Sequence, residues 1–155
     1  MHTLITFFLI LFFSLSIYSH GTAGSISEDE KDGRIISFPD TKRYKTLVTD
    51  LHTHSVFSDG HVWPNIRVKE ALLDGLDVLA VTEHLEYQPH IADIPHPDRN
   101  KSYLEAKTAA GKSDILIING SEITRDMPPG HINAVFVKDA NKLINLDPNK
   151  EKEAQ

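Results

Sequence analysis

The chain has 155 residues, a formal net charge of −6 and no cysteine. The lack of cysteine excludes disulfides, thiolate metal sites and a catalytic thiol, and an acidic chain without clustered Lys and Arg does not predict a nucleic-acid partner. Nine histidines are the unusual feature of the composition, because imidazole is the commonest metal ligand and a frequent proton carrier.

The amino-terminal segment is apolar and uncharged. No Asp, Glu, Lys or Arg precedes Glu28, and residues 4–17 form an almost unbroken apolar run. At about 14 residues the run is shorter than the roughly 20 that a membrane-spanning helix needs. It therefore predicts a signal peptide over residues 1–23, cleaved after Ala23, with no stable membrane span afterwards. A short uncleaved anchor is the alternative, and both predict export, to the periplasm or outside the cell.

Residues 24–45 are polar with mixed charges and predict a flexible lead-in. From Thr46 short apolar runs alternate with helical segments, which is typical of βαβ units and a parallel sheet. We expect strands over residues 47–51, 76–81, 115–118 and 132–137. Together residues 46–144 form one predicted α/β domain, and residues 145–155 a polar tail.

Two helices are expected between these strands. The first begins near Pro64 and stops at Gly75, with Val68, Ala71 and Leu72 on one face. The second covers residues 101–110 and a further helix starts within 139–144.

The second helix is expected to be capped by Asn100 and ended by Gly111. The loop before it, residues 85–100, contains three prolines and is long for a βα connection, which usually has about 2 to 6 residues. Such long loops tend to carry function.

Histidines and carboxylates gather near the ends of the predicted strands. His52 and His54 directly follow the first strand, and alternation along an extended segment sends both to the same side. Asp59 comes five residues later, in a Ser-Asp-Gly turn. One residue at each of the next three strands completes the set of candidate ligands: His52, His54, Asp59, His84, Glu122 and His131.

This convergence indicates a metal site. A lone His-x-His is a weak motif, but the carboxyl ends of barrel strands are where α/β barrels gather catalytic groups. Imidazole and carboxylate ligands without sulfur suit zinc, manganese or iron. Six ligands exceed what one tetrahedral ion uses, so we expect two or three divalent ions, with Glu122 able to bridge two of them.

Other polar residues near these motifs have competing interpretations. Arg125 either holds a substrate phosphate or is a solvated loop arginine, whereas Arg99 and Lys101 are interpreted as surface charges. Glu83 alternates to the side opposite His84, which favours a structural or supporting role.

The remaining histidines and two aromatic residues are less informative. The histidines in the loops are interpreted as solvated or hydrogen-bonded; they are His61, His90 and His96. Trp63 and Tyr87 either line a substrate pocket or pack in the core.

Three motifs carry a resemblance to a known family. DLHTHSVFSDG at residues 50–60, TEH at 82–84 and GSE at 120–122 resemble the PHP domain, the polymerase and histidinol phosphatase superfamily. The resemblance runs from about Val48 to Val137. It implies a distorted TIM-like (β/α)7 barrel whose di- or trinuclear metal centre hydrolyses phosphoesters. Five candidate residues match the family's ligands by position, with Glu122 in the bridging place, and His131 matches a further histidine.

The family pattern continues beyond what this sequence contains. Members complete the centre with a later histidine and an Asp-x-His, whereas no histidine follows His131 here. The sequence therefore resembles the amino-terminal part of a PHP barrel, and we expect a partial barrel, truncated at its carboxyl end.

The leading functional hypothesis is a metal-dependent phosphoesterase that attacks a small phosphorylated substrate with a metal-activated hydroxide. Two alternatives stay open. One is a truncated or degenerate metal-binding fragment without activity. The other is an amidohydrolase-like enzyme, in which a lysine usually bridges the ions where this chain has Glu122. The sequence predicts neither the substrate nor the oligomeric state.

Overall fold

The computed structural model describes residues 33–125 and 130–144. The predicted signal peptide, the first part of the predicted lead-in and the polar tail lie outside these residues, and the domain boundaries stay predictions. Residues 33–45 form neither helix nor strand and are mostly exposed. Within the described ranges, none of the helices combines the length and the apolar character that crossing a membrane requires.

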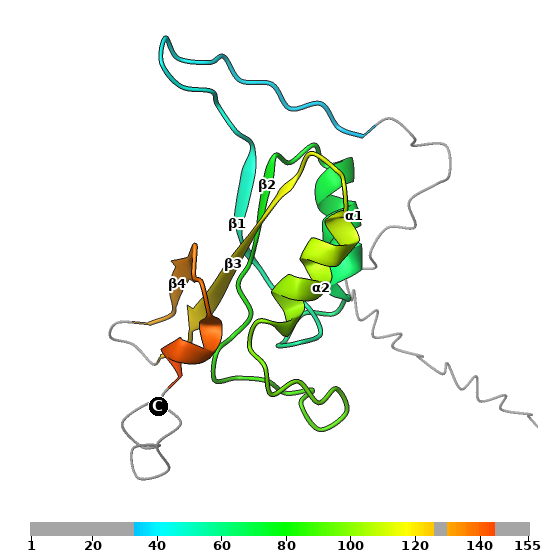
Figure 1. Cartoon of the computed structure of the whole chain (residues 1–155), viewed down its shortest axis with the longest axis vertical. Helices are drawn as coiled ribbons and strands as arrows, with labels where there is room; N and C mark the ends of the chain where they lie inside the picture. Colours follow the sequence, from blue (N-terminus) through cyan, green and yellow to red (C-terminus); the bar gives the residue numbers. More distant parts are fainter. Residues whose placement is uncertain (1–32, 126–129, 145–155) are drawn as a thin grey trace, which may run out of the picture. The chain divides into compact units, whose positions relative to one another are not determined.

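Four strands form one sheet in the order β1-β2-β3-β4 (Figure 1). Their bounds are Thr49–Thr53 for β1, Val78–Val81 for β2, Leu116–Ile123 for β3 and Ile132–Val135 for β4. Helix α1, Pro64–Leu73, connects β1 to β2, and helix α2, Lys101–Ala110, connects β2 to β3. The short 3₁₀ helix η1, Ala140–Leu143, follows β4. The mixed, curled sheet confirms the predicted α/β class and the partial TIM-like barrel.

The alternating pattern predicted a parallel sheet, but the observed sheet is mixed. Strand β1 pairs with β2 and β2 with β3 in parallel, but β4 pairs antiparallel to β3. A parallel connection needs a dozen or more residues, and the segment between Ile123 and Ile132 is shorter than that. The chain therefore turns back directly, and β4 lies beside the end of β3.

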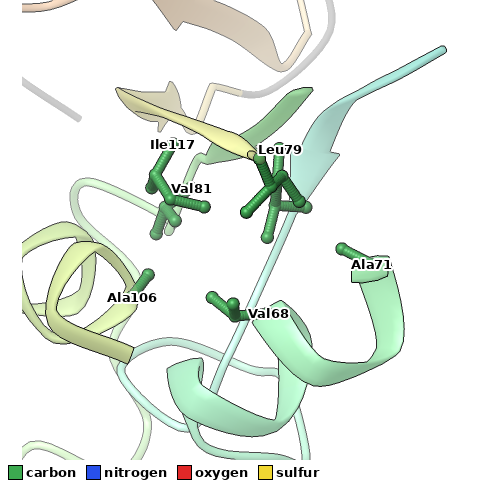
Figure 2. Close-up of a cluster of buried hydrophobic side chains, with 7 residues drawn as sticks. Val68, Ala71, Leu79, Val81, Ala106 and Ile117 are labelled. Carbon is green, nitrogen blue, oxygen red and sulfur yellow. The ribbon is translucent and has the colours of Figure 1, made fainter. Parts of the chain in front are cut away.

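The main core lies between the sheet and the two helices, which cover the same face (Figure 1). Figure 2 shows side chains from both helices meeting those of β2 and β3. Full burial of one such aliphatic side chain contributes about 1.5 to 3 kcal/mol. The buried residues of this cluster are Val68, Ala71, Leu79, Val81, Ala106, Ile115 and Ile117.

The predicted apolar face of α1 points in the right direction, but it includes a residue that is not buried. Val68 and Ala71 are buried as expected, whereas Leu72 is 42% exposed. Its side chain lies at the margin of the apolar stripe, outside the contact with the sheet. Gly75 follows the helix with a φ of +72°, and a Cβ there would lie 2.2 Å from the carbonyl oxygen of Arg34. Glycine at this stop is therefore required on both conformational and steric grounds.

Asn100 occupies the N-cap position of α2, but its side chain does not cap the helix. Its Oδ1 instead accepts hydrogen bonds from the backbone N–H of Ala140 at 2.8 Å and from Nδ2 of Asn119 at 2.9 Å. The expected helix beginning within residues 139–144 is the 3₁₀ turn η1. Asn100 thus connects the end of the long loop to η1 and β3.

Strand β3 is longer than predicted and contains Glu122. The four residues before its last, Asn-Gly-Ser-Glu at 119–122, are too polar to suggest a strand, yet residues 120–123 form the ladder with β4. At Gly120 a Cβ would lie 2.7 Å from the carbonyl oxygen of Ala134 and 2.9 Å from Cγ2 of Thr82. Only glycine allows the neighbouring strands to approach this closely.

Candidate metal centre

The strand register places the candidate ligands at one end of the sheet. His84 forms a parallel bridge with Glu122, just beyond the end of β2. On β3, Glu122 alternates in step with Leu116 and Ile118 and therefore faces away from the helices. His52 lies within β1 and His54 directly after it. The parallel strands β1, β2 and β3 therefore bring their polar carboxyl ends together.

Glu122 lies at the centre of the cluster and is almost fully buried, with 2% of its surface exposed. Its Oε2 lies 2.8 Å from Nε2 of His54 and 3.0 Å from Nε2 of His52. Its other oxygen, Oε1, contacts Nδ1 of His131, which directly precedes β4. The carboxylate of Glu122 therefore contacts the imidazole rings of three histidines.

A tight turn brings Asp59 to the same cluster. Its Oδ1 lies 2.6 Å from Nδ1 of His54, and its Oδ2 lies 3.4 Å from Nε2 of His84. Two backbone hydrogen bonds to the carbonyl of Ser55 close the turn, from Ser58 at 3.0 Å and Gly60 at 2.9 Å. A Cβ on Gly60 would lie 2.6 Å from the carbonyl carbon of His54. This close approach explains the glycine of the Ser-Asp-Gly motif.

The six residues form three overlapping groups in which one ligand atom per residue lies within 4.8 Å of the others. The groups share members, so His54, His84 and Glu122 each belong to two of them. They are His52, His54 and Glu122; His54, Asp59 and His84; and His84, Glu122 and His131.

The pKa values of both carboxyl groups in the cluster are lowered. Burial alone would raise the pKa of Glu122, but hydrogen bonds from His52 and His131 and electrostatic interactions with His84 and His54 lower it overall. Burial likewise opposes the lowering of the pKa of Asp59, which results from its hydrogen bond to His54 and from electrostatic interactions with His54 and His84. Both carboxyl groups are therefore ionised at neutral pH, the form in which carboxylates bind cations.

The donor set fits divalent transition metals. Each group combines neutral-capable imidazoles with one carboxylate, the ligands that zinc, manganese and iron accept, and the described residues offer no sulfur donor. The shared carboxylate of Glu122 is placed to join two of the groups. That these six residues bind metal stays a prediction, as do the number and the identity of the ions.

Thr124 and Glu86 support this site and were missed by the sequence analysis. Oγ1 of Thr124 lies 2.7 Å from Nδ1 of His84, which leaves Nε2 of His84 facing Asp59. Oε2 of Glu86 accepts a hydrogen bond from the backbone N–H of Thr124 at 2.9 Å. Both residues lie two positions beyond a candidate ligand, and this alternation was the available signal.

Arg125 lies beside the cluster but has a protein partner. Its Nη1 pairs with Oε1 of Glu86 and donates to the carbonyl of Thr124 at 2.8 Å. Among residues 33–125 and 130–144, its Nε and Nη2 have no hydrogen-bond partner. The guanidinium is therefore not freely solvated, and within the described residues part of its hydrogen-bonding capacity is unused.

The three loop histidines stand apart from the three ligand groups. His61 is exposed and His90 half-buried. His96 is buried, and its Nδ1 is hydrogen-bonded to the carbonyl of Ile94, the second of the two alternatives expected for these histidines. Arg99, expected at the surface, is partly buried, and loss of solvation lowers its pKa while the charge of Glu86 opposes this.

The two aromatic candidates differ in position. Tyr87 is 53% exposed and its ring lies edge-on to that of His84, with 5.7 Å between the centroids. Trp63 packs edge-on against Phe57 instead. Tyr87 is therefore the aromatic side chain that borders the cluster, and Trp63 belongs to the neighbouring apolar packing.

Fold and cluster together define a partial α/β barrel with a histidine and carboxylate centre at the strand ends. The sequence profile of the PHP domain matches residues 50–152, most of the chain. The chain belongs to the PHP domain family, which confirms the resemblance seen in its motifs. No curated protein matches the sequence.

Two solved structures are similar to the chain. A two-domain protein from Bacteroides vulgatus, described as containing a predicted PHP-like metal-dependent phosphoesterase, is 49% identical with a TM-score of 0.71 over 79% of this chain. A candidate metal-dependent phosphoesterase from Bifidobacterium adolescentis is 24% identical with a TM-score of 0.43 over 59% of this chain, too distant to carry weight. The chain spans 36% of the first protein and 27% of the second.

Proposed function

We propose that the protein carrying this chain is a metal-dependent phosphoesterase acting on a small phosphorylated substrate. One observation carries the proposal: buried Glu122 contacts His52, His54 and His131 at the end of β3, within a cluster of three potential metal-binding groups. Divalent ions bound there, zinc, manganese or iron, supply the Lewis acidity that activates water and offsets charge on a phosphoryl group.

Six residues of the chain are the proposed metal ligands. Glu122 would serve as a ligand in two of the groups, and so could be shared by two of the two or three ions expected. His52, His54, Asp59, His84 and His131 then complete the ligand set, each fixed by a strand end or by the Ser55–Gly60 turn. Because the donors are already gathered in place, little reorganisation is needed when metal binds.

Arg125 is the proposed contact to the substrate phosphate. Glu86 and the carbonyl of Thr124 hold Nη1, which fixes the plane of the guanidinium beside the cluster. The remaining N–H groups are suited to two hydrogen bonds with phosphate oxygens. Arg125 would then bind and orient the substrate and would hold its charge close to the metals.

The test uses the full-length protein, loaded with zinc or manganese, against a panel of phosphomonoesters, phosphodiesters, amides and lactones. We expect phosphoester hydrolysis, and we expect His52→Ala to lower both metal content and rate. Hydrolysis of amides or lactones in preference to phosphoesters would favour an amidohydrolase-like enzyme. A loaded protein that hydrolyses none of them would leave a metal-binding fragment without activity.

We also propose that the protein acts after export from the cytoplasm. The support is the uncharged apolar run of residues 4–17 with the small residues Gly21 and Ala23 beyond it. Amino-terminal sequencing of the protein recovered from its producing cells tests this. A mature chain beginning at Gly24 is the expected result, whereas a cytoplasmic protein that retains residues 1–23 would contradict it.

A further inference from the structure

Glu83 is a buried carboxylate on the opposite side of the chain from the candidate ligands. It directly precedes His84, and 6% of its surface is exposed. No Lys or Arg among the described residues forms an ion pair with it. An unpaired buried charge is costly unless hydrogen bonds compensate for it, so its surroundings require an explanation.

Three buried serines surround this carboxylate. The backbone N–H of Ser55 donates to both oxygens, at 3.1 and 3.0 Å, and its Oγ donates to Oε1 at 2.5 Å. Oγ of Ser58 donates to Oε2 at 2.5 Å, and Oγ of Ser102 donates to Oε1 at 2.6 Å. An ionised carboxylate only accepts hydrogen bonds, and here every neighbour is a donor.

These contacts join three separate elements. Glu83 follows β2, Ser102 lies in the first turn of α2, and Ser55 and Ser58 belong to the turn that carries Asp59. All three serines are buried, so the contacts are shielded from water. One carboxylate therefore fixes the Ser55–Gly60 turn to the strand end that carries His84.

We propose that Glu83 is a positioning residue that sets the geometry of the metal group formed by His54, Asp59 and His84. The inference rests on the proposed function in one respect, that this cluster binds divalent metal. Asp59 is the member most dependent on the turn, because the side chains that its carboxylate pairs with among the described residues are those of His54 and His84. Movement of the turn would carry Asp59 away from both.

The group formed by His84, Glu122 and His131 does not depend on the turn. His84 follows β2 and is bridged to Glu122 of β3, and His131 directly precedes β4, which pairs with β3. Loss of the Glu83 contacts should therefore weaken the group that contains Asp59 and spare the group that contains His131. A residue that contributed only to general stability would not discriminate between them.

The experiment titrates Zn²⁺ and Mn²⁺ into metal-free full-length protein by calorimetry, for the wild type, Glu83→Gln and Val68→Ala. Glu83→Gln keeps the shape but places an amide NH₂ against donors, and we expect the affinity of one class of site to fall about 10- to 100-fold, the range for residues that orient metal ligands. Val68→Ala truncates a core side chain remote from the cluster and provides a destabilised control.

Two outcomes would overturn the proposal. One is unchanged affinity and stoichiometry in folded Glu83→Gln, and the other is an equal loss of affinity in Val68→Ala at matched melting temperature. If Glu83→Gln does not fold, the metal titration is carried out on Ser58→Ala instead, because this change removes one hydroxyl beside Asp59. A weaker site in Ser58→Ala supports the proposal, and unchanged affinity contradicts it.

The readout is metal binding, which separates this inference from the proposed activity. A wild-type protein that binds metal but hydrolyses no phosphoester would refute the phosphoesterase and leave the role of Glu83 to be judged by the titration. An active enzyme whose Glu83→Gln variant binds metal normally would refute the role of Glu83 alone.

Discussion

Oε2 of Glu122 lies 2.8 Å from Nε2 of His54, although the two residues are 68 positions apart in the sequence. The contact joins β3 to the end of β1 across β2, so it exists only when the parallel register is correct. His54 and Glu122 belong to one candidate metal group, and each is also a member of a second group.

Glu122→Gln should remove the shared negative charge from the centre of the cluster. We expect hydrolysis by the full-length enzyme to fall at least about 100-fold, because charge stabilisation by bound metal contributes several kcal/mol, with a loss of bound metal. Initial rates and metal content by mass spectrometry measure this. Glu105→Gln on helix α2 is the matched control and should behave as wild type.

Gly60→Ala should distort the turn that carries Asp59. The added Cβ would lie within 2.7 Å of backbone atoms of His54 and Ser55, which cannot move aside without shifting the ligand itself. We expect a destabilisation of about 1 to 3 kcal/mol, the usual range for overpacking, together with reduced metal affinity.

The control for this change is Ala109→Gly on the exposed side of α2. It also alters one methyl group and costs roughly 0.5 to 1 kcal/mol as a glycine inside a helix. Thermal denaturation and metal titration of both variants are compared. Normal metal affinity in Gly60→Ala would show that the turn tolerates a side chain and that our account of the motif is wrong.

Arg125→Ala should weaken substrate binding more than it alters bound metal. A charge-assisted hydrogen bond contributes about 1.5 to 3 kcal/mol, so we expect kcat/KM to fall by roughly 10- to 100-fold, mainly through KM. Arg125→Lys keeps the charge but not the paired geometry and should recover part of the loss. Steady-state kinetics with unchanged KM in Arg125→Ala would exclude the phosphate contact.

Acid should loosen the contact between the long loop and η1. The pKa of Asp98 lies below its usual value of 3.8, because the side chain of Asn141 and the backbone of Asn100 donate hydrogen bonds to it, while burial opposes this. Its folded-state pKa is depressed, so the stability it contributes is present above about pH 4 and is lost as the pH falls through the folded-state pKa.

The measurement is the melting temperature of the wild type and Asp98→Asn from neutral pH to about pH 3. The variant should be less stable at neutral pH, and the difference should shrink as the pH falls. A difference that is constant with pH would mean that the ionised form of Asp98 makes no specific contribution.

The sequence predicted the six residues that the structure brings together, but not the residues that support them. His52, His54 and Asp59 belong to one local motif, and strand alternation alone predicts which side His84 and Glu83 take. Glu86 escaped notice because its partner Arg125 lies on another strand end, 39 residues away. Alternation places Glu86 on the same side as His84, but its pairing with Arg125 depends on how the strands are aligned.

The fold departed from expectation where local signals compete with tertiary pairing. Polar residues at 119–122 suggested the end of a strand, but pairing with β4 extends β3 through them. Asn100 has the usual character of a helix cap, yet η1 and β3 offer its side chain better partners. In both cases long-range hydrogen bonds outweigh a local preference.

The most direct test of the central claim is a paired measurement on the full-length protein, of bound metal and of phosphoester hydrolysis, before chelation, after chelation and after reloading with zinc or manganese. We predict two or three ions per chain, loss of hydrolysis on chelation and recovery on reloading. Hydrolysis that persists in metal-free protein, or a reloaded protein that hydrolyses no phosphoester, would contradict the account.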